Sequence, residues 1–197
     1  MKKLIVATGN AGKMREVREI VADLPYEVLS MKEAGVGTDP TEDGKTFEEN
    51  ALIKARAVSD LLPEGSDAIV IADDSGLEVD YLDKAPGIYS ARFMGHDTSY
   101  DIKNAAILEK LSGVPYEKRT ARFVCAIAAV FPDGTERTTR GTMEGFIADK
   151  IAGCNGFGYD PIFWLDEYGC TSAELTEEQK NAISHRGKAL RSMREYL

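Results

Sequence analysis

The order of strand-like and helix-like segments in the N-terminal part of the chain restricts the fold more than any other feature of the sequence. Three short apolar runs predict strands, at residues 3–7, 26–30 and 68–72. Between the first two runs, residues 12–23 place apolar side chains at helical spacing. Before the third run, Thr46 and Glu49 form a capping box for a helix that runs to about residue 62. This alternation is typical of a parallel sheet with helices packed on its faces.

The middle of the chain adds a different kind of strand pairing. Two strand-like segments, 120–131 and 135–147, flank the dipeptide Asp133-Gly134. An Asp-Gly pair between two strands strongly indicates a hairpin. A hairpin that follows parallel strand–helix–strand units predicts an α/β fold with a mixed central sheet and flanking helices. We expect two lobes with a substrate cleft between them.

Helix start signals occur at three further places, at Thr98 or Ser99, at Thr176 with Gln179, and at Ser184. The first of these helices is expected to run to about residue 111, and the last is expected to end at the chain terminus. Because no linker rich in Pro, Gly or Ser interrupts the sequence, residues 1–197 are expected to form one domain.

Composition excludes several classes of protein. The chain has 24 Lys+Arg against 33 Asp+Glu, a net charge of −9, which argues against a partner such as a nucleic-acid polymer or an anionic membrane. No apolar run approaches the roughly 20 residues of a membrane span, and the run after Met1 is too short for a signal peptide. The three cysteines are too few and too widely spaced for a disulfide framework or a zinc site. We therefore expect a soluble, cytoplasmic protein.

A first candidate site lies where the first strand meets the first helix. Its six residues are Thr8, Gly9, Asn10, Ala11, Gly12 and Lys13. Backbone N–H groups and the helix dipole favour a phosphate there, and Lys13 adds a cation. The segment is not a Walker A loop, because Met14 stands where that motif has Ser or Thr. A plain glycine turn with an exposed lysine is an equally good interpretation.

A second candidate site, Asp73-Asp74-Ser75-Gly76, directly follows the apolar run 68–72. Strand ends are where α/β folds place ligand chemistry. Because side chains alternate along an extended segment, the two carboxylates should point to different sides. One of them could hold a hard cation or accept a proton from water, and Ser75 could donate to a phosphate oxygen. The alternative is an Asx turn that ends the strand.

A third candidate is the acidic loop 39–44, which could supply a second carboxylate to Mg²⁺. Lys54, on the helix that follows, could reach a phosphate from the side of that helix. A solvated loop and a surface lysine are the alternatives.

The remaining candidates suit a purine base. The loop 153–161 is rich in glycine, and Phe157 offers a flat face for stacking. Lys180, His185 and Arg186 are hydrogen-bond donors that suit the oxo groups and ring nitrogens of a purine. The alternatives are an irregular loop with Phe157 in the core, and a solvated helix face.

Six stretches in this order resemble the inosine triphosphate pyrophosphatase family, which hydrolyses deaminated purine nucleoside triphosphates. They are TGNAGKMREV, TFEENALIKA, IADDSGLEVD, APGIYSARF, GFGYDPIF and AELTEEQKNAISHRGKAL. The resemblance covers nearly the whole chain. It implies an elongated two-lobed α/β protein with a cleft, which works as a homodimer with Mg²⁺.

The resemblance also implies roles for individual residues. Glu42 and Asp74 bind or position the metal, and Asp74 accepts the proton of the attacking water. Ser75 contacts the substrate. The triphosphate is held by Thr8, Gly9, Asn10, Ala11, Gly12, Lys13 and Lys54. The base is recognised by Phe157, Gly158, Tyr159, Asp160, Lys180, His185 and Arg186.

The expected activity is hydrolysis of ITP, dITP, XTP and dXTP to the nucleoside monophosphate and pyrophosphate, which would clean the nucleotide pool. A pocket of donors would leave adenine facing unpaired buried groups, and such mismatches cost a factor of about 10⁴ or more. The alternative is a catalytically inactive, nucleotide-binding regulatory module, which would need the phosphate loop but not the acidic residues. The presence of Glu42, Asp73 and Asp74 favours the enzyme.

Overall fold

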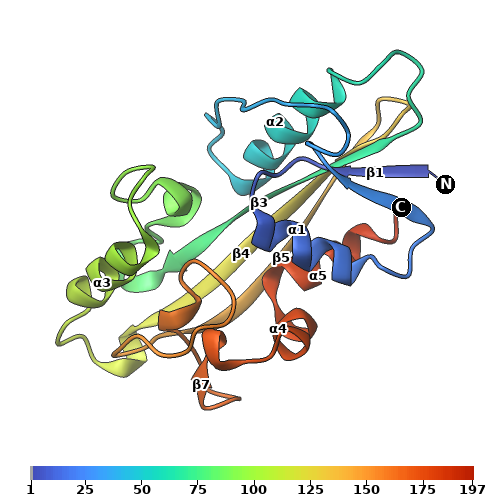
Figure 1. Ribbon diagram of the computed structural model, residues 1–197. Helices are drawn as coiled ribbons and strands as arrows, with labels where there is room; N and C mark the ends of the chain where they lie inside the picture. Colours follow the sequence, from blue (N-terminus) through green and yellow to red (C-terminus); the bar gives the residue numbers. More distant parts are fainter. Residues whose placement is uncertain (1) are drawn as a thin grey trace. The chain divides into compact units, whose positions relative to one another are not determined.

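The structure is a computed structural model that describes residues 2–197, so Met1 lies outside the described residues (Figure 1). The strands are β1 (Lys2–Val6), β2 (Tyr26–Ser30), β3 (Ile69–Val79), β4 (Thr120–Val130), β5 (Glu136–Ile147), β6 (Phe163–Leu165) and β7 (Cys170–Thr171). The α-helices are α1 (Ala11–Ile20), α2 (Phe47–Ser59), α3 (Tyr100–Lys110), α4 (Glu177–Ile183) and α5 (His185–Met193). Short 3₁₀ helices lie at Asp80–Leu82, Gly87–Arg92, Tyr116–Lys118, Asp160–Ile162 and Ser172–Glu174.

The strands form one mixed sheet in the order β2-β1-β3-β4-β5-β6-β7. Strand β1 is parallel to both of its neighbours, with Leu4 opposite Val28 of β2 and Ile69 of β3. Strand β6 is antiparallel to β5 and to β7. The parallel part comes from the N-terminal alternation, and β4 and β5 are neighbours joined by the Asp133-Gly134 turn. The predicted α/β class with a mixed sheet and flanking helices is confirmed.

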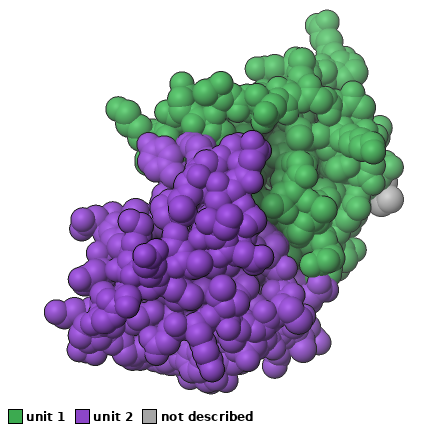
Figure 2. Space-filling view, turned by 60° about the vertical axis from the view of Figure 1, so that its left-hand side comes forward, with its two compact units in different colours: residues 1–74, 125–141, 186–197 green, residues 75–124, 142–185 purple. Residues whose placement is uncertain are grey.

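The chain divides into two compact units (Figure 2). Unit 1 comprises the segments up to Asp74, Cys125–Gly141 and Arg186–Leu197, and unit 2 comprises Ser75–Val124 and Thr142–His185. Each unit has a buried apolar core. In unit 1, Met14 and Val17 of α1 pack with β1, β3, β4 and α5. In unit 2, Ile107 of α3 packs with β5, β6 and the C-terminal end of β3. That residues 1–197 form a single domain stays a prediction.

Local helix signals are confirmed where a side chain meets the backbone of its own turn. Thr176 and Gln179 form the predicted capping box of α4. At α2, the hydroxyl of Thr46 accepts the N–H of Glu49 at 3.1 Å, but the Glu49 carboxylate accepts the N–H of Lys45. At α3, Ser99 occupies the cap position without a side-chain hydrogen bond.

Two predicted boundaries are wrong. The strand expected at 68–72 continues to Val79, so the Asp73–Gly76 stretch lies inside β3 instead of forming a turn at its end. The reason is that β3 has β4 as a sheet neighbour and nearly all of its residues are buried. The last helix ends at Met193, before the chain terminus. Among residues 2–197, no helix is both long and apolar enough to cross a membrane.

Candidate active site

The predicted phosphate loop connects β1 to α1. Asn10 caps the helix, because its side-chain oxygen accepts the N–H of Lys13 at 3.0 Å. The Thr8 hydroxyl in turn accepts the N–H of Asn10 at 3.2 Å. Gly9 and Asn10 are exposed. The loop therefore presents the positive end of α1 to its surroundings, which is the arrangement that favours an anion.

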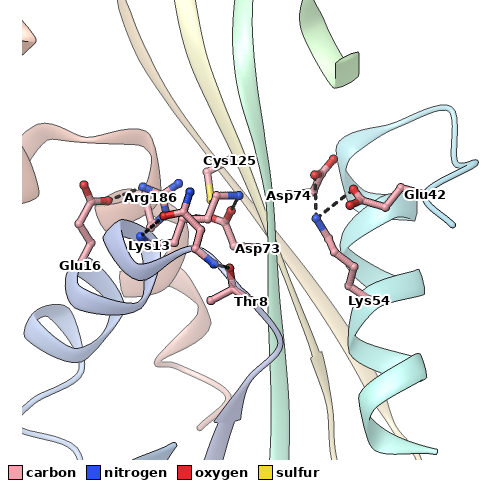
Figure 3. Close-up of polar contacts among 10 residues, drawn as sticks. Thr8, Lys13, Glu16, Glu42, Lys54, Asp73, Asp74, Cys125 and Arg186 are labelled. Atoms are coloured by element: carbon pink, nitrogen blue, oxygen red, sulfur yellow. Dashed lines mark hydrogen bonds and ion pairs between the residues drawn. The ribbon is translucent and has the colours of Figure 1, made fainter. Parts of the chain in front are cut away.

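Two groups of charged side chains lie on opposite sides of β3 (Figure 3). Asp73 points toward α1 and α5, whereas Asp74 points toward α2. The alternation predicted for these two carboxylates is confirmed, and it follows from the strand conformation of both residues. The two carboxylates therefore have different partners and different chemistry.

The first group, which we call the Asp73 cluster, consists of Lys13, Glu16, Asp73, Cys125 and Arg186. Asp73 forms an ion pair with Lys13 and accepts the Nε–H of Arg186 at 2.8 Å. The Cys125 thiol donates to the same carboxylate at 2.9 Å. Nη1 of Arg186 also pairs with Glu16. Glu16, Asp73, Cys125 and Arg186 are buried, so these charges have partners inside the protein.

Ionisation in the Asp73 cluster follows from these pairs. Burial alone would raise the pKa of Asp73, but the charges of Arg186 and Lys13 hold it well below its usual value. Burial raises the pKa of the Cys125 thiol well above its usual value, so the thiol keeps its proton. Asp73 is therefore an ionised anchor at neutral pH and is poorly suited to accept a proton.

The second group, which we call the Asp74 cluster, consists of Glu42, Lys54 and Asp74. The ammonium of Lys54 donates to Oδ1 of Asp74 at 2.9 Å and to Oε2 of Glu42 at 3.1 Å. Oδ2 of Asp74 is buried and has no hydrogen-bond partner among the described residues. The loop that carries Glu42 is fastened to α2, because Oδ1 of the buried Asn50 accepts the N–H of Gly44 at 2.9 Å.

Burial raises the pKa of Asp74 above its usual value, and the Lys54 ammonium offsets part of that effect. Burial would lower the pKa of Lys54, but the carboxylates of Asp74 and Glu42 outweigh it and raise the pKa. The pKa of Asp74 is thus raised, whereas that of Asp73 is lowered. Neighbouring carboxyl groups whose pKa values are shifted in opposite directions are suited to different acid–base roles. Asp74, with one oxygen unengaged, is the one suited to accept a proton.

The predicted base-recognition residues Phe157, Asp160, Lys180 and His185 belong to unit 2. Asp160 organises the loop, because its Oδ2 accepts the Phe157 N–H at 2.9 Å and the Lys180 ammonium at 2.6 Å. The same ammonium lies 5.1 Å from the centroid of the Phe157 ring. Asp160 is 2% exposed. Its carboxylate is therefore occupied in fixing Phe157 and Lys180.

Other predicted residues have structural contacts of their own. Tyr159 is buried in the core of unit 2, and its hydroxyl donates to the carbonyl of Ser90 at 2.8 Å. The ring of His185 stacks on Phe123, with centroids 4.9 Å apart. Ser75 follows Asp74 in β3 and is half-buried. Arg186 belongs to the Asp73 cluster in unit 1, whereas the sequence grouped it with Lys180 and His185.

Known proteins share both the sequence and the fold of this chain. A sequence model of the Ham1 family matches residues 4–196. The chain belongs to the Ham1 family. A relative from Caldanaerobacter subterraneus subsp. tengcongensis is 51% identical, over 100% of this chain and 96% of its own length. A second, from Clostridium perfringens, is 49% identical, over 100% of this chain and 98% of its own length.

Both of these Ham1 relatives are named dITP/XTP pyrophosphatase, and the resemblance predicted from the six sequence stretches is confirmed. Solved Ham1 structures share the fold. The Staphylococcus aureus Ham1 protein has a TM-score of 0.85 at 41% identity and covers 99% of this chain and 97% of its own. A HAM1 protein from Coxiella burnetii has a TM-score of 0.85 at 37% identity, with 98% and 96% covered.

The Asp74 cluster of this Ham1 protein fits the Mg²⁺ that the resemblance implies. Among residues 2–197, no group of three or more His, Cys, Asp or Glu residues is arranged to hold a metal. Mg²⁺ does not need such a group, because it is usually bound by one or two carboxylates together with substrate phosphates and water. Asp74 and Glu42 supply two carboxylates with hard oxygen ligands, and the two lie close together because both accept from the Lys54 ammonium.

Several residues that shape the site were missed by the sequence analysis. Glu16 and Cys125 complete the Asp73 cluster, Asn50 fastens the Glu42 loop, and Ser172 donates to Asp160 at 2.7 Å. Only Glu16 has a usable sequence signal, since it stands three residues after Lys13 and so shares its helix face. The partners of the other three residues lie far away in the sequence.

Proposed function

We propose that this chain hydrolyses ITP, dITP, XTP and dXTP to the nucleoside monophosphate and pyrophosphate. The observation that carries the proposal is the buried Asp74 carboxyl, with one oxygen held by Lys54 and the other unengaged. A relative that is 51% identical over the full chain is named dITP/XTP pyrophosphatase, and this name supports the same reaction and the same purine substrates.

The phosphate side of the substrate is assigned to unit 1. The N–H groups at the start of α1, with the side chains of Thr8 and Asn10, surround one end of the triphosphate. Lys13 and Lys54 supply positive charge for the phosphate oxygens. Ser75, which follows in β3, donates its hydroxyl to the substrate. Three cations, Lys13, Lys54 and Arg186, lie beside these carboxylates, and Mg²⁺ held by Asp74 and Glu42 would add the positive charge that an anion needs, even though the chain carries −9 overall.

Chemistry is assigned to Asp74. A water molecule attacks the α-phosphorus, Asp74 accepts its proton, and the new P–O bond forms as the bond to the pyrophosphate oxygen breaks. The raised pKa of Asp74 makes it a stronger base than an ordinary carboxylate. Lys54 holds the Asp74 carboxyl in place and offsets negative charge on the leaving group. When bound by Asp74 and Glu42, Mg²⁺ supplies further positive charge to the phosphates.

Base selection is assigned to unit 2. Phe157 stacks on the purine, and Lys180 and His185 donate to its 6-oxo group and ring nitrogens. Asp160 acts by fixing Phe157 and Lys180, and Gly158 and Tyr159 shape the loop between them. Adenine has an amino donor where hypoxanthine and xanthine have an oxo acceptor, so it leaves these donors unpaired.

We also propose that the protein acts as a homodimer in the cytoplasm, in keeping with the family resemblance. Its partner is the small-molecule nucleotide; no nucleic-acid polymer or membrane is involved, in keeping with the net charge of −9. Light scattering of the purified protein tests the dimer, which predicts twice the mass of the 21.5 kDa chain.

The test of the function is a pyrophosphate-release assay with ITP, XTP, GTP and ATP, each with and without Mg²⁺. We expect rapid release from ITP and XTP, little from GTP and ATP, and loss of activity when Mg²⁺ is removed. Release of inorganic phosphate without pyrophosphate would replace the proposal with a stepwise phosphatase. Nucleotide binding without turnover would favour the regulatory module.

A further inference from the structure

Four charged side chains of the Asp73 cluster form a series of ion pairs with alternating charge. Lys13 pairs with Asp73, Asp73 with Arg186, and Arg186 with Glu16. Lys13 and Glu16 are three residues apart on α1, so the two ends of this series lie on one face of that helix. All four residues belong to unit 1.

Burial makes each member of this series depend on its neighbours. Arg186 is 1% exposed, Asp73 2% and Glu16 6%. Charges this deeply buried need paired partners, because transfer of an unpaired charge from water is strongly unfavourable. The four side chains are neutral together, with two cations and two anions, so removal of one charge changes how the other three share their partners.

We propose that Glu16 is a positioning residue for Lys13, acting through Arg186 and Asp73. Glu16 takes one end of the Arg186 guanidinium, and so limits how strongly Arg186 draws on the Asp73 carboxylate. The carboxylate then keeps an oxygen available for Lys13, and Lys13 is held at the start of α1, beside the loop that would bind the phosphates. The inference rests on the proposed function, in which Lys13 binds the triphosphate.

Glu16→Gln keeps the shape of the side chain and removes its charge. Arg186, which remains charged and buried, then depends on Asp73 for its compensating charge, and Lys13 loses its fixed position. We expect the KM for ITP and the dissociation constant for pyrophosphate to rise by the same factor, about tenfold, which corresponds to about 1.4 kcal/mol. We expect kcat to change less than KM, because Asp74 and Lys54 lie on the other side of β3.

The experiment is a double-mutant cycle of wild type, Glu16→Gln, Lys13→Ala and the double variant, with calorimetry of pyrophosphate binding in the presence of Mg²⁺ as the main readout. If Glu16 acts through Lys13, Glu16→Gln has no further effect once Lys13 is alanine. Glu19→Gln, an exposed residue of the same helix, is the matched control and is expected to bind pyrophosphate as wild type does.

An equal loss of affinity with and without Lys13 would overturn the proposal, since it would indicate a general disturbance of α1. Unchanged affinity in Glu16→Gln would also overturn it. If Glu16→Gln does not fold, Glu16→Asp replaces it, because aspartate keeps the charge on a shorter side chain. Glu16→Asp should lower the affinity for pyrophosphate less than Glu16→Gln would, and again only when Lys13 is present. A failure of wild-type ITP turnover would reject the proposed function instead, and pyrophosphate calorimetry would still decide the role of Glu16.

Discussion

Replacement of Asp73 by asparagine is the sharpest test of the buried charge cluster. The two side chains are nearly the same size, so the change removes a charge and leaves the volume almost unaltered. Asp73 is 2% exposed and accepts from Arg186 at 2.8 Å and from Cys125 at 2.9 Å, besides its ion pair with Lys13. The side-chain NH₂ of asparagine is a hydrogen-bond donor and cannot accept. On one side of residue 73 it would therefore meet another donor in place of an acceptor.

The expected loss is large because Arg186 stays charged and buried. Breaking a buried ion pair by removing one partner costs about 3–5 kcal/mol. For a chain of this length, each 1 kcal/mol lowers the melting temperature by about 2–4 °C, so we expect a fall of about 6–20 °C. The pKa of Asp73 in the folded state lies well below its usual value of 3.8. The stabilisation is therefore fully present above the unfolded-state pKa, and it is lost as the pH falls through the folded-state pKa.

The assay is urea unfolding of wild type and variant at pH 7, with Asp23→Asn as the matched control. Asp23 makes the same kind of contact, to Arg194 at 2.6 Å, but its side chain is 67% exposed. Exposed pairs are screened by water and salt, so we expect Asp23→Asn to change the unfolding free energy little. If Asp73→Asn is no more destabilised than Asp23→Asn, the reasoning about the cluster is refuted.

Three further predictions concern activity. Asp74→Asn should lower kcat by about 10²–10⁴-fold with nucleotide binding retained in calorimetry; unchanged kcat would remove Asp74 from the mechanism. Because burial raises the pKa of Asp74, the wild-type kcat/KM should fall on acidification at a pH above 3.8, the usual carboxyl value, and a limb at or below that value would contradict the assignment. Gly156→Ala places a Cβ against the Asp160 carboxylate, 3.0 Å from Nζ of Lys180, at a φ of +73°, and should raise the KM for ITP. Gly134→Ala, at a φ of +80° with nothing within 4 Å, carries the same backbone strain without the collision, and an equal rise there would rule out the collision as the cause.

The parts of this fold that the sequence predicts are those with local causes. The strand–helix order of the N-terminal part, the Thr176 helix cap and the opposite directions of Asp73 and Asp74 all depend on residues a few positions apart. Helix periodicity, capping and strand alternation act over that range. For this reason the segment that was predicted to bind phosphate connects a strand to a helix, as expected, between β1 and α1.

The remaining features depend on residues that are far apart in the chain. Arg186 binds Asp73 across 113 positions and Glu16 across 170, and nothing in the helix that carries Arg186 indicates which surface it buries. Its donors therefore suggested base recognition. The strand was predicted to end at residue 72 for a similar reason, because β4, which accompanies β3 in the sheet, is formed by a distant segment.

The central claim is that water attacks the α-phosphorus with Asp74 as the base, and the position of the solvent oxygen in the products tests it most directly. ITP is hydrolysed in ¹⁸O-labelled water, and the products are analysed by mass spectrometry. The account predicts one ¹⁸O in the inosine monophosphate and none in the pyrophosphate. Label in the pyrophosphate instead would mean attack at the β-phosphorus and would contradict the mechanism.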